Sequence, residues 1–207
     1  MPLVYRKYTS NYVIGIWKIT ESLDQLLKEW KNKTPDEFDL VKNVFRKRQW
    51  LAARILAKRL AGISGISYAP SGKPFISGKN IYKSISISHS RRLLVIIAGK
   101  KMASGIDIEM IEPRIEKIAG KFINEQEKKM LTPDLALMQM YLIWCAKETL
   151  FKYYSPESFD FKNDFTVLPF PCMEKGSLSV LIKNHSPEKI KKLHYFFLKR
   201  SICVYTD

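Results

Sequence analysis

Two acidic residues are spaced so that they could bind a divalent cation. Asp107 and Glu109 stand two residues apart in the alternating segment Gly105-Ile106-Asp107-Ile108-Glu109, and side chains two apart on a strand point to the same face. Neighbouring carboxylates repel each other, and Mg²⁺ or Mn²⁺, which prefer oxygen ligands, would relieve that repulsion. The alternative is an exposed strand whose polar face carries two acids.

A third acid, Glu148, lies in the segment Trp144-Cys145-Ala146-Lys147-Glu148-Thr149-Leu150-Phe151-Lys152. Trp144, Glu148 and Lys152 are four residues apart, so a helix places them in one stripe. The preceding turn is almost wholly apolar, which aims Glu148 near the core, where a carboxylate needs a cation, hydrogen bonds or a proton. Glu148 is therefore a candidate metal ligand or general base. The alternative is an ordinary helical ion pair with Lys152.

A third group of residues is suited to holding phosphate oxygens. Ser88 and His89 lie in the polar, basic segment 86–92, and Lys73 precedes them in Gly72-Lys73-Pro74. Hydroxyl, imidazole and cationic side chains bind phosphate by charge-assisted hydrogen bonds. No Walker loop or G-x-S-x-G elbow is present, so an ordinary ATPase or serine hydrolase is not supported. A polar turn between strands is the alternative, but with the three acids this group describes a site for displacement at phosphorus.

Composition narrows the class of partner. The 207 residues are 46% hydrophobic, enough for one core or two small halves, and 35 basic against 20 acidic residues give a net charge of +15. Negatively charged partners are therefore expected. The start of the chain has no signal-peptide pattern and the apolar run 135–146 is too short to cross a bilayer, so a soluble cytoplasmic protein is expected. Three cysteines without metal spacing indicate neither disulfides nor zinc.

Local patterns predict the elements that carry these residues. For the first half they predict a strand over 12–19, a short helix after a capping box at Ser22, a long helix from Thr34-Pro35 to near Gly62, and strands over 81–88 and 93–98. For the second half they predict a strand over 103–110, a short helix over 122–130, a long helix from Thr132-Pro133 to about Tyr154, and strands over 165–168, 177–182 and 195–205. Thr-Pro-Asp opens both long helices, which hints at two similar halves.

These motifs resemble those of the 4′-phosphopantetheinyl transferases of the type that serves surfactin synthetase. Residues 105–109 and 144–152 are similar to that family's GxDIE and WxxKE(A/S)xxK motifs. Supporting matches, in the family's order, are Gly72-Lys73-Pro74, Ile87-Ser88-His89-Ser90 and Leu51-Ala52-Ala53-Arg54. The resemblance covers roughly residues 45 to 155.

The resemblance implies a fold, a reaction and partners. The fold is α/β (α+β), a pseudo-dimer of two similar halves, 1–102 and 103–207, each a small, mainly antiparallel sheet packed with a long helix. The N-terminal half would contact the cofactor phosphates, and the C-terminal half would hold the metal and catalytic residues. The implied enzyme transfers phosphopantetheine from coenzyme A to a serine of an acyl or peptidyl carrier protein and releases adenosine 3′,5′-bisphosphate. A Mg²⁺-dependent monomer is expected, with Mn²⁺ as the alternative ion and with no nucleic acid or membrane as partner.

The resemblance also implies roles for individual residues. Asp107, Glu109 and Glu148 would hold Mg²⁺, Glu148 would also be a candidate base, and Lys152 would neutralise charge on the departing phosphate. Ser88, His89 and Lys73 would grip the phosphates of coenzyme A. An arginine that relatives often place before Gly-Lys-Pro is missing here, and the candidates to replace it are Arg46, Arg48 and Arg54, of which Arg48 and Arg54 are the predicted contacts.

Other functions fit the composition. A metal-dependent nuclease or basic nucleic-acid-binding protein would also use acids and a positive charge, although the aromatic residues form no recognisable RNA-binding signature. A non-catalytic adaptor that recognises acidic domains is a third reading. Thr149 stands where the family has alanine or serine, a change that the helix should tolerate. Glu127 resembles a recurring acid of the family but carries no assigned role.

Overall fold

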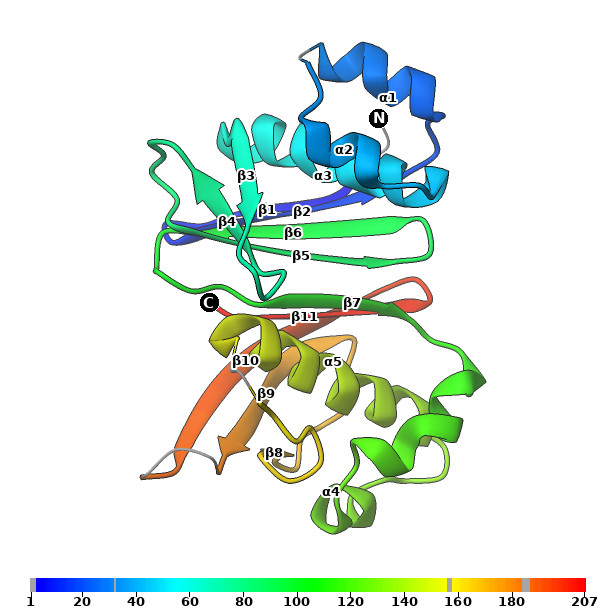
Figure 1. Ribbon diagram of the computed structural model, residues 1–207. Coiled ribbons are helices and arrows are strands. Elements are labelled where there is room, and N and C mark those ends of the chain that lie inside the picture. Colours follow the sequence, from blue (N-terminus) through cyan, green and yellow to red (C-terminus); the bar gives the residue numbers. More distant parts are fainter. Residues whose placement is uncertain (1–2, 32, 156–157, 184–186) are drawn as a thin grey trace. The chain divides into compact units, whose positions relative to one another are not determined.

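The chain forms two compact units, each with its own hydrophobic core. The computed structural model describes residues 3–31, 33–155, 158–183 and 187–207 (Figure 1). Unit 1 comprises Met1–Ser104 and unit 2 comprises Gly105–Asp207, so the division falls two residues beyond the predicted one. The expected mixture of helices and antiparallel sheets is confirmed.

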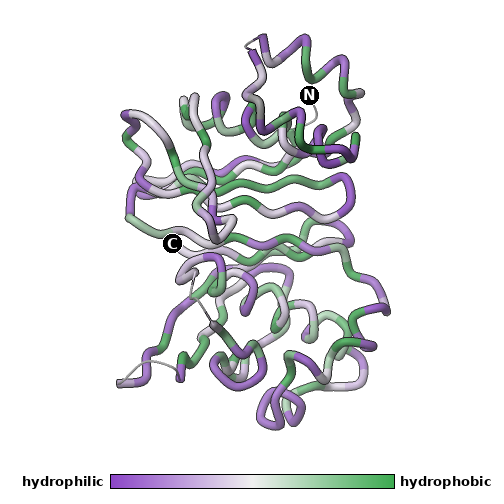
Figure 2. Tube along the Cα trace, viewed as in Figure 1, coloured by the Kyte–Doolittle hydropathy of each residue, from purple (hydrophilic) through white to green (hydrophobic). Residues whose placement is uncertain are grey.

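Unit 1 is built on a four-stranded antiparallel sheet. Its strands, in spatial order, are β1 (Leu3–Tyr8), β2 (Tyr12–Lys18), β6 (Leu93–Gly99) and β5 (Ser84–Ser90). The long helix α3 (Val44–Ala61) packs on β2 and β6, and their apolar residues, visible as hydrophobic runs in Figure 2, form the core with it. The remaining elements are α1 (Leu23–Trp30), α2 (Asp36–Leu40) and the hairpin of β3 (Gly65–Tyr68) and β4 (Pro74–Ser77).

Unit 2 is built on a five-stranded antiparallel sheet. Its strands, in spatial order, are β7 (Ile106–Met110), β11 (Ser201–Tyr205), β10 (Lys189–Leu198), β9 (Lys175–Ile182) and β8 (Phe165–Val167). The long helix α5 (Ala136–Tyr154) packs on β7 and β11, and it follows the 3-10 helix η1 (Pro113–Lys121) and the short helix α4 (Glu125–Lys129). None of the helices in the described ranges has the length and hydropathy needed to cross a membrane.

The predicted single helix from Thr34-Pro35 to Gly62 is wrong in its first part. The chain forms the short helix α2, leaves the helical conformation at Val41, and starts α3 anew after Asn43. The Asn43 side chain accepts a hydrogen bond from the backbone N–H of Arg46, so a second N-cap outcompetes helix continuation. The predicted end is confirmed, because Gly62 adopts the left-handed conformation that closes α3.

Other boundaries also differ from the pattern. The predicted strand over 81–88 is β5, which begins three residues later, and the predicted strand over 195–205 is a hairpin that turns at Lys199-Arg200. Helix α5 begins at Ala136 without a side-chain cap, and the predicted helix over 122–130 shortens to α4. The sequence patterns do not predict strand β1 or helix η1.

Gly105 permits a close approach between α5 and the start of β7. A Cβ atom at this position would lie 2.1 Å from the backbone oxygen of Thr149 and 3.1 Å from the Cβ of Tyr153. The first of these atoms belongs to the backbone of a buried helix, so it cannot move aside as a flexible side chain can. The absence of a side chain at Gly105 therefore sets the distance between α5 and the strand that carries Asp107 and Glu109.

We expect Gly105→Ala to lower the free energy of unfolding by about 1–3 kcal/mol, because the added methyl group overpacks the interface between helix and strand. Gly120→Ala in η1 is the matched control, since a Cβ there would meet no atom within 4 Å. Urea denaturation of both variants measures the effect. Equal stabilities for the two variants would contradict the packing argument.

Candidate functional site

Strand β7 presents Asp107 and Glu109 on the face of the sheet that α5 covers. In the antiparallel register Asp107 lies opposite Val204 and Glu109 lies opposite Ile202, and both of these β11 residues belong to the core beneath α5. Residues directly opposite in such a pair point to the same side. The shared face predicted from the two-residue spacing is therefore confirmed, and Asp107 is almost completely buried there.

Lys152 of α5 supplies a positive charge to this face. Its Nζ donates to Asp107 Oδ1 at 2.7 Å and to the backbone oxygen of Ile106 at 3.3 Å. Burial alone would lower the pKa of Lys152, but the charge and hydrogen bond of Asp107 and the charge of Glu148 act together in the opposite direction, and the pKa is raised. Lys152 therefore remains an ammonium ion at neutral pH, and its direct partner is Asp107 rather than Glu148, the partner in the simple helical ion pair.

The charged form of Glu148 is unfavourable in this environment. Burial raises its pKa, the negative charges of Asp107 and Glu109 raise it further, and Lys152 acts in the opposite direction; the result is a pKa of about 7. Such mutual influence requires the three carboxyl groups to be near one another. The charges of Asp107 and Glu109 on β7 therefore act on Glu148 of α5, the helix that packs on this strand.

Arg114 provides a second cation at the edge of this group. Its Nη2 lies 3.9 Å from Glu109 Oε2, and its Nε lies 3.1 Å from Glu112 Oε2. The hydroxyl of Tyr141 on α5 donates to the Glu112 carbonyl oxygen at 3.1 Å. Glu109 therefore lies between a largely exposed arginine and the interior, where Asp107 and Glu148 are found.

The carboxylates of Asp107, Glu109 and Glu148 are of the type that binds a hard divalent cation, although their oxygens do not converge on one point. Within the part of the chain that the structure describes, no group of three or more histidine, cysteine, aspartate or glutamate side chains forms a ready-made metal site. The chemistry of the set nevertheless suits Mg²⁺, because carboxylate oxygens are its preferred protein ligands. Burial and, after it, the negative charges of Asp107 and Glu109 raise the pKa of Glu148, and a bound cation would offset both effects.

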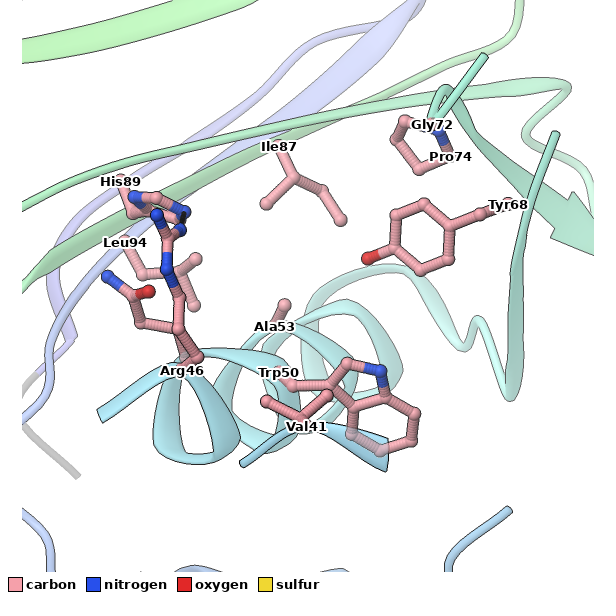
Figure 3. A pocket seen from close by; sticks show the side chains of 11 residues that line it. Val41, Arg46, Trp50, Ala53, Tyr68, Gly72, Pro74, Ile87, His89 and Leu94 are labelled. Atoms are coloured by element: carbon pink, nitrogen blue, oxygen red, sulfur yellow. Dashed lines mark hydrogen bonds between the residues drawn. The ribbon is translucent and has the colours of Figure 1, made fainter. Parts of the chain in front are cut away.

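Unit 1 contains a cavity of about 380 Å³ between α3, the β3–β4 hairpin and the sheet (Figure 3). Arg46 and His89 lie on one side of it, and Tyr68, Gly72 and Pro74 lie on the opposite side. The other lining residues are Val41, Gln49, Trp50, Ala53, Ile87 and Leu94. The cavity thus combines apolar and aromatic walls with cationic or polar groups at one side, as ligand pockets typically do.

The predicted phosphate contacts are distributed unevenly around this cavity. His89 lines it, and its Nε2 lies 2.8 Å from Arg46 Nη1, whereas Lys73 falls between the lining residues Gly72 and Pro74. Burial lowers the pKa of Lys73. Ser88, next to His89 on β5, is buried.

The two predicted arginine contacts are not among the residues that line the cavity. Arg54 is buried, donates to the Ile66 carbonyl oxygen at 3.0 Å, and stacks on the ring of Trp50 with its Cζ 3.2 Å from the ring centroid. Burial lowers its pKa. The Nε of Arg48 is buried and has no hydrogen-bond partner among the described residues. The geometry thus favours Arg46, the third candidate, as the exposed arginine beside His89.

Sequence reasoning missed the aromatic walls of the cavity. Trp50 lies on α3 and Tyr68 on β3, and the guanidinium of Arg54 lies close to both rings. A signal was present in the sequence, because Trp50 directly precedes the Leu51–Arg54 match and Tyr68 precedes Gly72 by four residues. Their joint role depends on how the hairpin packs on α3, which local patterns do not reveal.

Comparisons with known proteins point to one family. The model of the 4′-phosphopantetheinyl transferase superfamily matches residues 103–201, which include Asp107, Glu109, Glu148 and Lys152. The chain is also 26% identical over 131 residues to the 4′-phosphopantetheinyl transferases AcpT of Salmonella typhi and Salmonella typhimurium. Each of these alignments spans 60% of this chain and 67% of the relative.

We expect Glu148→Gln to stabilise the metal-free protein at alkaline pH. Because the pKa of Glu148 is about 7 in the folded protein against an ordinary 4.5, the folded state binds more protons between these pH values. The contribution of this carboxyl to stability is therefore full below pH 4.5 and is lost as the pH rises through 7. At pH 8 the variant should exceed the parent by about 2 kcal/mol, with little difference at pH 4.5. Urea denaturation in a chelator measures this, and a difference independent of pH would contradict the expectation.

Proposed function

We propose, since this chain is an enzyme of the 4′-phosphopantetheinyl transferase superfamily, that its acidic site and its unit 1 cavity act on coenzyme A and a carrier protein. The reaction is the transfer of phosphopantetheine to a carrier protein. The observation that carries the assignment of the site is the cluster of Asp107, Glu109 and Glu148 with Lys152, inside the region that matches the family.

Asp107, Glu109 and Glu148 are the residues that would hold Mg²⁺, with Mn²⁺ as the alternative ion. Bound there, the cation would offset the negative charge that develops on the pyrophosphate during transfer. The three carboxylates contribute oxygen ligands from two elements, β7 and α5, whose separation Gly105 sets. This assignment is supported by the donor chemistry and by the raised pKa of Glu148.

The remaining chemistry is proton transfer and charge neutralisation by the protein itself. The serine oxygen of the carrier forms a bond to the phosphorus that bears the pantetheine arm, while the bond from that phosphorus to the bridging oxygen breaks. Glu148 is also the candidate base that accepts the serine proton. Lys152 neutralises charge on the departing phosphate of adenosine 3′,5′-bisphosphate.

The unit 1 cavity is proposed to bind the adenosine 3′-phosphate part of coenzyme A. Its volume and its aromatic walls, Trp50 and Tyr68, suit a flat heteroaromatic base. His89 and Arg46, on one side of the cavity, would bind the phosphate oxygens. Ser88 points to the opposite face of β5, because side chains alternate along a strand, and Lys73 adjoins the other side of the cavity at Gly72 and Pro74.

The net charge of +15 fits an acidic protein partner. Positive charge raises the rate at which an acidic carrier protein is encountered and makes that rate sensitive to salt. We propose an acyl or peptidyl carrier protein as substrate, with the enzyme acting as a cytoplasmic monomer of the type that serves surfactin synthetase. Incubation with coenzyme A, Mg²⁺ and apo carrier proteins, followed by mass spectrometry of the carrier, tests the proposal. Absence of a phosphopantetheine adduct on every carrier would reject it.

Asp107→Asn is expected to reduce turnover by about 100-fold or more, because an amide removes the negative charge at the ligand position while keeping the shape of the side chain. Asp134→Asn, which alters an exposed acid of the same unit, is the matched control. Steady-state transfer assays at saturating coenzyme A compare the two variants. A fully active Asp107→Asn enzyme would show that this residue is no ligand.

His89→Ala is expected to raise the KM for coenzyme A by about 10-fold with a smaller effect on kcat, because it removes a group that binds the substrate away from the reacting atoms. The KM for the carrier protein, which the cavity does not contact in this proposal, serves as the internal control. If the KM for coenzyme A were unchanged, the cavity would have to be reassigned.

A further inference from the structure

Both neighbours of Glu148 on α5 are polar residues with no exposure to solvent. Lys147 and Thr149 are completely buried, whereas Glu148 between them is only partly buried. Burying an ammonium or a hydroxyl group is costly unless a partner satisfies it. An aliphatic residue at either position would pack without that requirement. Glu148 is therefore flanked by two side chains, one on each side, whose burial costs free energy unless they are hydrogen-bonded.

Lys147 ties α5 to the elements on one side. Its Nζ donates to Glu127 Oε2 at 2.8 Å and to the carbonyl oxygen of Phe122 at 2.5 Å. Glu127 in turn accepts from the backbone N–H of Val167 at 2.8 Å and from that of Asn124 at 2.9 Å. This completely buried ion pair thus connects α5 with α4 and β8, and it gives Glu127 a structural partner twenty residues along the chain.

Thr149 ties α5 to the sheet on the other side. Its Oγ1 donates to the carbonyl oxygen of Val204 at 3.0 Å, and Val204 is the residue that lies opposite Asp107 in the register of β11 and β7. The bond therefore links the helix that carries Glu148 to the strand beside the one that carries Asp107. Thr149 also has its backbone oxygen at the position of closest approach to Gly105.

Two such bonds fix the rotation of the helix. Successive residues of an α-helix are separated by about 100° around its axis, so Lys147 and Thr149 project in directions about 200° apart with Glu148 between them. A rotation that moved Glu148 away from Asp107 and Glu109 would break at least one of these bonds. The hydrogen bonds of Lys147 go to Glu127 and Phe122 and that of Thr149 goes to Val204, so these residues act on the site through the position of Glu148 between them.

We propose that Lys147 and Thr149 are positioning residues that hold α5 in the rotation at which Glu148 faces Asp107 and Glu109. The inference rests on the proposed function, because it assigns these residues to the geometry of the proposed cation site. Partners that orient metal ligands typically change metal affinity or activity by about 10–100-fold when they are removed.

Thr149→Val is the decisive variant because it has almost the same shape and lacks only the hydroxyl donor. We expect it to weaken Mn²⁺ binding, measured by electron paramagnetic resonance in the presence of coenzyme A, by about 10-fold. It should lower kcat and raise the Mg²⁺ concentration for half-maximal transfer, with the KM for coenzyme A unchanged. Thr149→Ser, which restores the donor, should recover both quantities.

Gln139→Met on the same helix controls for a purely structural effect. Gln139 is also buried, donates to the carbonyl oxygen of Met130, and accepts from the backbone N–H of Thr132, but it lies nine residues before Glu148. We expect this variant to lose thermal stability while retaining the Mn²⁺ affinity of the parent. All variants are compared at a temperature at which circular dichroism shows them fully folded.

The double variant Lys147→Met with Glu127→Gln tests the other side of the helix without leaving a lone buried charge. We expect the same loss of Mn²⁺ affinity as for Thr149→Val. If this variant does not fold, Thr149→Val alone decides, since it changes no charge.

The outcomes separate two failures. A parent protein that neither binds Mn²⁺ nor modifies a carrier refutes the proposed function and the inference with it. A parent that binds Mn²⁺ and is active, with a Thr149→Val variant equal to it in Mn²⁺ affinity and kcat, refutes the inference alone. A loss of affinity in Thr149→Val that Thr149→Ser does not recover also refutes it, because the hydroxyl would then not be the cause.

Discussion

Helix α5 lies so close to strand β7 that the carbonyl oxygen of Thr149 occupies the space that a side chain at position 105 would need. This contact holds a carboxylate on the helix beside two carboxylates on the strand, although like charges repel each other in a poorly solvated environment. Two features reduce this repulsion. Lys152 forms an ion pair with Asp107, and Glu148 binds a proton more readily than an exposed glutamate does. The close packing of the α5 backbone on Gly105 is therefore the reason that these charged groups influence one another.

The two units contribute different chemistry. In unit 2 the described site consists of charged side chains: Glu148 and Lys152 on helix α5, and Asp107 on the adjacent strand β7. In unit 1 the cavity is arranged around shape, with aromatic and aliphatic walls and the cationic groups confined to one side. A molecule that joins a flat base to phosphates carries groups that suit both kinds of surface, and this is the basis on which coenzyme A is proposed as the substrate.

The parts of the site that follow local periodicity could be read from the sequence, and the parts that depend on packing could not. The alternation of β7 placed Asp107 and Glu109 on one face, and the four-residue spacing placed Lys152 beside Glu148. Local patterns did not show that Asn43 would interrupt the long helix, because the apolar spacing continues through Val41, Val44 and Phe45 on both sides of it. The cavity escaped prediction because its walls come from α3 and a hairpin that meet only in the folded chain. The burial of Arg54 against Trp50 was hidden for the same reason.

The separate cores of the two units bear on how the protein loses its structure. The buried clusters of unit 1 and unit 2 share no residue, so each unit has its own source of hydrophobic stabilisation, and a single melting temperature need not describe the whole chain. Of the four tryptophans, Trp17, Trp30 and Trp50 belong to unit 1, and Trp144 alone belongs to unit 2. Trp144 packs on Phe122 and Phe161 within its own unit. In a variant whose three unit 1 tryptophans are replaced by phenylalanine, the fluorescence of Trp144 would report the unfolding of unit 2 alone.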